Sequence, residues 1–235
     1  MKRSLLAVAA GVSGAMAVCG VFQPINSTFL RLVTVGAVVA FYAAVLMLCW
    51  RVKVLRWAWL AVPAIPLLVV ALPGREPDVG KLREAYVAAL PRYTGAGYVW
   101  GGEGRMGIDC SGLPRTALRD ALFTEGLRTA NGRLIREAIR QWWFDASARA
   151  LSEGYRDYMI PLFPAKALRS ADFSTLKPGD VAITATGVHC LVYLRGDSWI
   201  QADPAVGRGE SFDARSTDNA WFDDSVKLYR WSVLK

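Results

Sequence analysis

The stretch GYVWGGEGRMGIDCSGLPRTALRDAL, residues 97–122, carries the most informative pattern in this sequence of 235 residues. Glycines and aromatic residues run into Asp-Cys-Ser-Gly, where Cys110 is predicted to open a helix that continues to about Phe123. Pro114 falls in the first turn of that helix, where proline is tolerated. At a helix N-terminus the dipole and the free N–H groups lower the pKa of a thiol, so the position of Cys110 favours a nucleophile.

The chain contains one histidine, His189, so only this residue can act as an imidazole base for Cys110. It lies in a predicted strand, Val188–Leu194, whose side chains alternate between two faces. The alternation puts Cys190 on the face opposite His189, and we expect Cys190 to be a small core residue outside the site. A cysteine with a neighbouring histidine is a common arrangement for nucleophilic catalysis.

A general base works best when a third group holds its ring and tautomer. Gln201 lies in the next predicted strand, Trp199–Ala202. A turn at Arg195–Asp197 would place Gln201 beside His189 as a cross-strand neighbour. Asp203, two residues further along the same face, is the competing orienter if the strand register differs.

The glycine-rich segment before Cys110 supplies candidates for substrate contact. Gly101 and Gly102 allow the backbone to pass close to a bound chain. Tyr98 precedes Cys110 by twelve residues. Its phenolic O–H, together with the backbone N–H of Cys110, is a candidate to stabilise an oxyanion.

The first 72 residues are typical of a membrane anchor, because they contain no Asp or Glu and are mostly apolar. Three segments are long enough to be predicted as transmembrane helices: 4–22, 32–50 and 54–72. The third contains prolines and needs Arg56 to snorkel to the interface. A competing interpretation treats Met1–Ala17 as a cleaved signal peptide.

Basic residues predict the orientation of the anchor. Lys2, Arg3 and the Arg51–Arg56 cluster should remain on the cytoplasmic side. The following linker, residues 73–79, and the rest of the chain are then expected outside the cytoplasm. Both interpretations of the first apolar segment place the domain on the side of the membrane away from the cytoplasm.

The net charge of +8 is mainly a property of this anchor. Six of the 28 Lys and Arg residues lie in residues 1–72, so the remainder carries 22 basic and 20 acidic residues. A nucleic-acid-binding domain would need a basic excess in the soluble part. No nucleic-acid partner is therefore predicted.

The soluble part is predicted to be an α+β domain. Asp78 can cap a helix through Lys81–Leu90, and residues 128–153 show a second helical pattern that includes Trp142 and Trp143. We expect this second helix to cover the core, with a membrane-surface or partner-binding face as the alternative. Antiparallel strands are predicted from a two-residue period at Val181–Thr184, Val188–Leu194, Trp199–Ala202 and Val226–Trp231.

The combination of motifs resembles the NlpC-type cell-wall peptidases, papain-like cysteine hydrolases of bacteria. The matching pieces occur in the family's order: YVWGG (98–102), DCSGL (109–113), LKPGDV (176–181), VHCLVYL (188–194) and WIQAD (199–203). The resemblance covers roughly residues 80–235. It implies a papain-like fold with helices packed on an antiparallel sheet. Together with the predicted anchor, it implies a location at a bacterial inner membrane, with the domain on the periplasmic or extracellular side.

Carried onto this chain, the resemblance implies a site of eight residues. The catalytic ones would be Cys110 as nucleophile, His189 as base, Gln201 in the third position and Tyr98 beside the oxyanion. Those contacting the substrate would be Trp100, Gly101, Asp109 and Ser111. The implied reaction is hydrolysis of an amide bond in a peptidoglycan stem peptide, without metal or cofactor, and the spacing of the four cysteines indicates no metal site.

Two features depart from the family pattern. A helical insertion at about 128–155 lengthens the segment after Cys110, and a membrane anchor stands in place of wall-binding repeats. Two other hypotheses therefore remain beside the hydrolase. One is an acyltransferase or amidase that uses the same Cys–His pair on lipid-linked or protein substrates, and the other is a non-catalytic scaffold that binds peptide.

Overall fold

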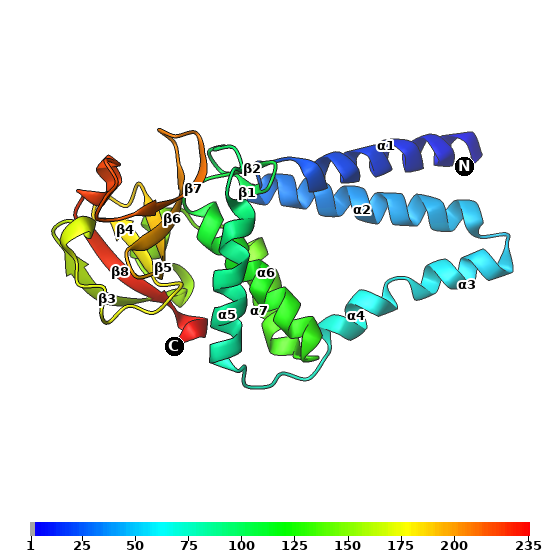
Figure 1. Ribbon diagram of the computed structural model, residues 1–235. Helices are drawn as coiled ribbons and strands as arrows, with labels where there is room; N and C mark the ends of the chain where they lie inside the picture. Colours follow the sequence, from blue (N-terminus) through cyan, green and yellow to red (C-terminus); the bar gives the residue numbers. More distant parts are fainter. Residues whose placement is uncertain (1–2) are drawn as a thin grey trace.

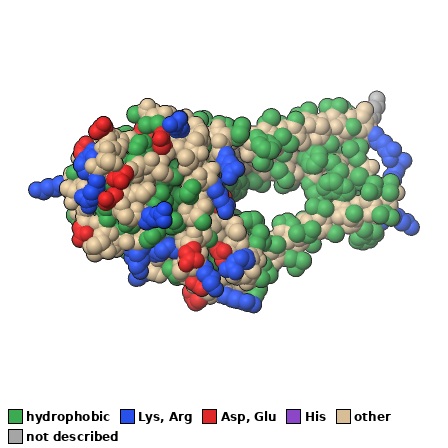
Figure 2. Space-filling model, viewed as in Figure 1, with side chains coloured by type: hydrophobic (Ala, Val, Ile, Leu, Met, Phe, Trp, Pro, Cys, Tyr) green, Lys and Arg blue, Asp and Glu red, His purple; other side chains and the backbone are tan. Residues whose placement is uncertain are grey.

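A computed structural model describes residues 3–235 as a group of apolar helices joined to an α+β domain (Figure 1). The apolar helices are α1 (Arg3–Phe22), α2 (Thr28–Cys49), α3 (Lys53–Ala61) and α4 (Ala64–Val70). Three stretches are long and apolar enough to cross a membrane: Arg3–Phe22, Thr28–Cys49 and Lys53–Val70. Most of their large apolar side chains are exposed, and apolar side chains cover these helices on the face seen in Figure 2. Such helices require a lipid or protein environment around them.

Two boundaries in this region differ from the sequence prediction. The segment 54–72 is not one helix, because Pro63 lacks the N–H of a helical turn and separates α3 from α4. The second apolar helix begins at Thr28 and not at residue 32, since Ser27 caps it and its first turn includes Arg31. The charge of Arg31 is tolerated there because the domain supplies its partner.

The helices of the domain are α5 (Val79–Ala89), α6 (Gly112–Arg128), α7 (Gly132–Trp143) and α8 (Ala148–Ser152). Asp78 caps α5, as predicted. The helical pattern predicted over 128–153 is divided in two, because α7 ends at Trp143 and α8 begins at Ala148 after its cap Ser147. Before α7, Ala130 has a positive φ of 48° and Asn131 caps the helix, so the chain breaks there after α6. Gly132 is required at that break, because a Cβ there would lie 1.9 Å from the carbonyl oxygen of Leu72.

Six strands form one antiparallel sheet in the order β3-β8-β4-β5-β6-β7. They are β3 (Met159–Ala165), β4 (Val181–Thr184), β5 (Cys190–Arg195), β6 (Ser198–Asp203), β7 (Arg208–Asp213) and β8 (Val226–Trp231). A short hairpin, β1 (Glu103–Gly104) with β2 (Gly107–Ile108), precedes α6. Five 3₁₀ turns complete the described part: Leu90–Tyr93, Tyr155–Asp157, Leu168–Ser170, Ala220–Phe222 and Ser232–Leu234.

The predicted α+β class is confirmed, and the two strands that the sequence pattern missed are the two edges of the sheet. β3 contains Pro161 and Pro164, which an edge strand accommodates because one side of its backbone needs no partner. β7 is polar and half exposed, so it lacks the apolar alternation of a buried strand. The predicted strand 188–194 begins two residues later, at Cys190.

Each face of the sheet carries its own apolar core. Cys190, Val192 and Ile200 pack with the helices on one face, while Leu191, Tyr193 and Trp199 belong to a second cluster on the other face. The helices α5, α6 and α7 therefore cover one side of the sheet (Figure 1). The alternation predicted for β5 is confirmed from Cys190 onward.

A buried ion cluster joins the apolar helices to the domain. Glu103 on β1 contacts Arg31 of α2 at 3.0 Å, Arg115 at 2.7 Å and Arg119 at 2.9 Å. Arg31 also donates to the carbonyl oxygen of Trp143 at 3.0 Å. Burial would raise the pKa of Glu103, but the charges of the three arginines outweigh it and lower that pKa. The carboxylate is thus ionised and shared by α2 and α6.

We predict that Glu103→Ala destabilises the full-length chain by about 3–5 kcal/mol, because it leaves buried guanidinium groups without a counter-charge. Thermal unfolding in detergent micelles measures the effect. Glu76→Ala is the control, since Glu76 pairs with Arg133 on the surface and is 86% exposed; it should change stability little. Equal losses in the two variants would contradict the structural role of the cluster.

Candidate functional site

The position of Cys110 is determined by the side chain that precedes it. Asp109 accepts hydrogen bonds from the backbone N–H of Gly101 at 2.8 Å and of Gly112 at 2.5 Å, and from the Ser111 hydroxyl at 3.0 Å. These bonds tie the glycine-rich loop to the first turn of α6. Cys110 therefore lies directly before the N-cap residue Ser111, at the positive end of the helix.

The approach of the loop to the helix requires glycine at two positions. A Cβ on Gly112 would lie 2.0 Å from the carbonyl oxygen of Gly102, and a Cβ on Gly102 would lie 2.6 Å from the backbone of Gly107. No side chain fits at either distance. The glycine of the DCSG sequence is thus a packing requirement of the turn that carries the cysteine.

His189 is buried next to the cysteine, and its ring is held from one side by an amide. The oxygen Oε1 of Gln201 lies 2.6 Å from Nε2 of His189. Gln201 in turn donates from its own Nε2 to Oδ2 of Asp203 at 3.1 Å, which directs the amide oxygen toward the ring. Since an amide oxygen only accepts, Nε2 carries a proton, and Nδ1 remains the nitrogen available for proton exchange with a thiol. Gln201 contacts the ring and Asp203 contacts Gln201.

Two residues that the sequence did not suggest complete this arrangement. The indole of Trp221 stacks on the His189 ring with 4.2 Å between centroids and 18° between planes. Trp221 also donates to Oδ1 of Asp203 at 3.4 Å, and Asn219 donates to Oδ2. Both come from the segment before β8, which is close to the site only because the chain folds back there.

The environment makes the Cys110 thiol acidic. Its pKa is lowered to about 5 by a hydrogen bond with the Cys190 thiol and, against the cost of burial, by the hydrogen bond and charge of His189. A free cysteine titrates near 8.5, so Cys110 is largely a thiolate at neutral pH. The pKa of Cys190 is raised by the same hydrogen bond and by burial.

Cys190 is a small core residue, as predicted, and its thiol also contacts Cys110. Its side chain is 1% exposed in the core, but its thiol lies 2.8 Å from the carbonyl oxygen of Cys110. The reason is that the N-terminus of α6 packs directly on the first residue of β5. The core face of that strand and the site therefore meet at Cys190.

Cys110 opens into a cavity of about 440 Å³, which we call the Cys110 cleft. Tyr98, Trp100, Gly101, Asp109 and Ser111 all line it, so the structure brings six of the eight candidate residues to one surface. His189 and Gln201 are each 1% exposed and lie behind the cysteine. The carboxylate of Asp109 is occupied by the bonds of the turn. The side chain of Trp100 is the most exposed of the group, at 82%.

One wall of the Cys110 cleft was not suggested by the sequence. Ile25, Asn26 and Ser27, from the connection between α1 and α2, line it together with Gly187 and Val188. Their only sequence signal is a short polar interruption between two apolar runs.

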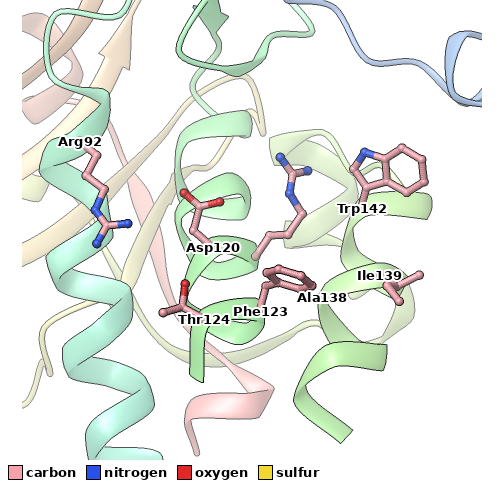
Figure 3. Close-up of a pocket in the computed structure, with 8 residues that line it drawn as sticks. Arg92, Asp120, Phe123, Thr124, Ala138, Ile139 and Trp142 are labelled. Atoms are coloured by element: carbon pink, nitrogen blue, oxygen red, sulfur yellow. The ribbon is translucent and has the colours of Figure 1, made fainter. Parts of the chain in front are cut away.

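A second cavity, of about 510 Å³, lies between α6 and α7 and includes Arg92 (Figure 3). Asp120, Phe123 and Thr124 of α6 face Ile139 and Trp142 of α7 across it. It shares no lining residue with the Cys110 cleft. Within residues 3–235, no group of three or more His, Cys, Asp or Glu side chains is placed to hold a metal ion.

A family model matches most of the domain. The model described as the NlpC/P60 family aligns with residues 95–227, which include Tyr98, Cys110, His189 and Gln201. This chain belongs to the NlpC/P60 family. No curated protein matches its sequence.

Solved structures of NlpC/P60 proteins are similar to this chain at low identity. NlpC1 from Trichomonas vaginalis is 16% identical over 63% of this chain and 43% of its own, with a TM-score of 0.41. The NlpC/p60 domain of the peptidoglycan hydrolase SagA is 21% identical over 62% of this chain and 97% of its own, at 0.35. The peptidoglycan hydrolase RipB from Mycobacterium tuberculosis is 16% identical over 63% and 65%, at 0.40. The chain spans less than half the length of the Trichomonas protein.

We predict that Cys190→Ala raises the pKa of Cys110 from about 5 by about 1–2 units, because a hydrogen bond to a charged group is worth about 1.5–3 kcal/mol. The rate of iodoacetamide alkylation against pH reports this pKa: alkylation appears as pH rises through it and is lost below it. Cys190→Ser, which keeps a donor, should stay closer to the native midpoint. An unchanged midpoint in the alanine variant would show that His189 alone acidifies the thiol.

Proposed function

We propose that this NlpC/P60 protein is a membrane-anchored cysteine hydrolase that cleaves amide bonds in peptidoglycan stem peptides. The observation that carries the proposal is geometric: Cys110 lies at the N-terminus of α6 and lines a cleft of about 440 Å³, and the buried ring of His189 is held by Gln201. The lowered pKa of the Cys110 thiol agrees with this arrangement. Its family includes the peptidoglycan hydrolases SagA and RipB, which supports the substrate.

The mechanism follows from the charges at the site. The thiolate of Cys110 attacks the carbonyl carbon of the scissile amide, and the carbonyl oxygen takes up the negative charge. The backbone N–H of Cys110 and the hydroxyl of Tyr98, which lines the same cleft, would stabilise that oxyanion. His189 holds on Nδ1 the proton that it took from the Cys110 thiol and gives it to the leaving amine, so the C–N bond breaks and a thioester remains.

Hydrolysis of the thioester restores the enzyme. A water molecule attacks the thioester carbonyl while His189 accepts its proton, and the C–S bond breaks to release a carboxylic acid and the Cys110 thiolate. Gln201 holds the ring through both steps because Asp203 holds Gln201. The Trp221 stack prevents the ring from tilting out of line.

The location that we propose is a bacterial membrane with the domain outside. Residues 51–56 lie at the turn between α2 and α3, at the end of the helices remote from the domain (Figure 1). Basic side chains gather at that end in Figure 2. The positive-inside rule places that end in the cytoplasm.

Cys110→Ala should abolish the release of stem-peptide fragments from purified peptidoglycan, because no other group supplies the nucleophile. Gln201→Ala should lower turnover by less than the roughly 10²–10⁴-fold that a general base contributes, since it orients the base without replacing it. Mass spectrometry of the muropeptides measures both. A product that carries a transferred acyl chain, with unchanged muropeptides, would favour the acyltransferase hypothesis instead.

The orientation is tested with the full-length chain in bacterial spheroplasts. A tag after Lys235 should be removed by external protease, whereas a tag inserted between Arg51 and Lys53 should be protected. The opposite pattern would place the domain in the cytoplasm.

A further inference from the structure

The connection between α1 and α2 is built into the wall of the Cys110 cleft. Ile25 pairs with Gly102 as an antiparallel bridge, and the backbone N–H of Asn26 donates to the carbonyl oxygen of Gly101 at 3.3 Å. The backbone N–H of Glu103 donates to the carbonyl oxygen of Pro24 at 3.1 Å. Residues 24–27 thus extend the glycine-rich loop that leads to Cys110. The cleft is completed by the membrane-associated segment.

This wall lies within a few residues of the predicted membrane surface. Ser27 lines the Cys110 cleft and is also the N-cap of α2. α2 has 22 residues, and at about 1.5 Å per residue it matches the roughly 30 Å hydrocarbon core of a bilayer. The cleft would then open in the headgroup layer.

The side chains around the mouth of the cleft suit that layer. Ile25, Trp100 and Val188 are 45%, 82% and 56% exposed, so three neighbouring apolar side chains face outward. Tryptophan is enriched at the membrane interface, where its ring contacts lipid and its N–H contacts water. An exposed apolar rim on the part of the domain nearest the spanning helices indicates contact with lipid rather than with bulk water.

The domain is also held close to the membrane from a second direction. The segment expected to be a linker is fastened to α7: Asn131 exchanges two hydrogen bonds of 3.0 Å with the backbone of Arg75, and the N–H of Gly132 donates to Pro73 at 3.0 Å. Arg136 donates to the carbonyl oxygens of Val70 and Leu72. With the Glu103 cluster at the other side, the domain has two attachments and cannot extend away from the membrane.

We propose that the substrate is a stem peptide still attached to a membrane lipid, and that Ile25 in the α1–α2 connection is a specificity residue for it. This proposal rests on the proposed hydrolase activity. It specifies that the peptide is attached to a lipid when the enzyme binds it. A cleft in the headgroup layer receives a peptide that a lipid carries, whereas a wall polymer would have to enter that layer. Ile25 contacts the peptide segment next to the lipid.

The test uses the full-length protein in phosphatidylcholine–phosphatidylglycerol vesicles with three substrates. These are a stem peptide joined to a phosphoglyceride headgroup by a short spacer, the same peptide free in solution, and isolated cell-wall polymer. The lipid-attached peptide should be cleaved at least about ten-fold faster than the free peptide. Cleavage of the polymer or the free peptide at an equal or higher rate would overturn the lipid-linked substrate while leaving the hydrolase intact. Cleavage of none of the three would remove the proposed function itself.

Variants of Ile25 test whether this side chain binds the peptide. The enrichment of the lipid-attached peptide at the vesicle surface is the same for every variant, so it cannot cause a difference between them. Ile25→Ser should raise KM for the lipid-attached peptide by about ten-fold with kcat nearly unchanged, because apolar contacts in a pocket are worth about 1–3 kcal/mol. Ile25→Val should restore most of the affinity. Leu127→Ser, at an exposed apolar residue at the far end of α6, is the matched control and should behave as the native chain.

Folding of the Ile25 variants is checked by the pH midpoint of Cys110 alkylation, which should equal the midpoint measured for the native chain in the same experiment. A native midpoint with an unchanged KM in Ile25→Ser would overturn the role of the α1–α2 connection. If that variant fails to fold, the rate of Ile25→Val and the comparison of the three substrates still decide the proposal.

Discussion

The site depends first on one buried carboxylate. Asp109 binds the backbone of Gly101 on one side and of Gly112 on the other, and so fixes the loop against the first turn of α6. Burial raises the pKa of Asp109, and the N–H groups that it binds partly offset that rise. Because the turn is so tight that Gly112 admits no Cβ, Cys110 has only one place to lie. Without this turn the thiol would not meet the strand that carries His189.

A series of buried polar side chains positions the other groups around Cys110. Asp203 orients Gln201, Gln201 orients His189, and His189 with Cys190 stabilises the thiolate of Cys110. Each group is buried, so each hydrogen bond acts in a medium of low polarity, where it is stronger than in water. The arrangement concentrates one negative charge on a sulfur atom beside a cleft. This is the electrostatic condition for nucleophilic attack at neutral pH.

A second constraint links the site to the apolar helices α1 and α2. Glu103 is shared by Arg31 of α2 and by Arg115 of α6, the helix whose N-terminus carries Cys110. The residues of the α1–α2 connection therefore have a defined position in the cleft wall. The cleft and the apolar helices are therefore parts of one packed unit.

The sequence by itself determined the α+β class, the apolar helices, the cysteine at a helix tip and the single histidine, since these follow from composition and from local periodicity. It did not determine the edge strands β3 and β7, the division of the 128–153 pattern into α7 and α8 or the separation of α3 from α4, because edge positions and breaks carry weak or conflicting local signals. Nor did it show Trp221 stacked on His189 or Ile25 in the wall of the Cys110 cleft. These two residues come from segments far from Cys110 in the chain, and only packing, which depends on residues of all those segments at once, brings them to the site.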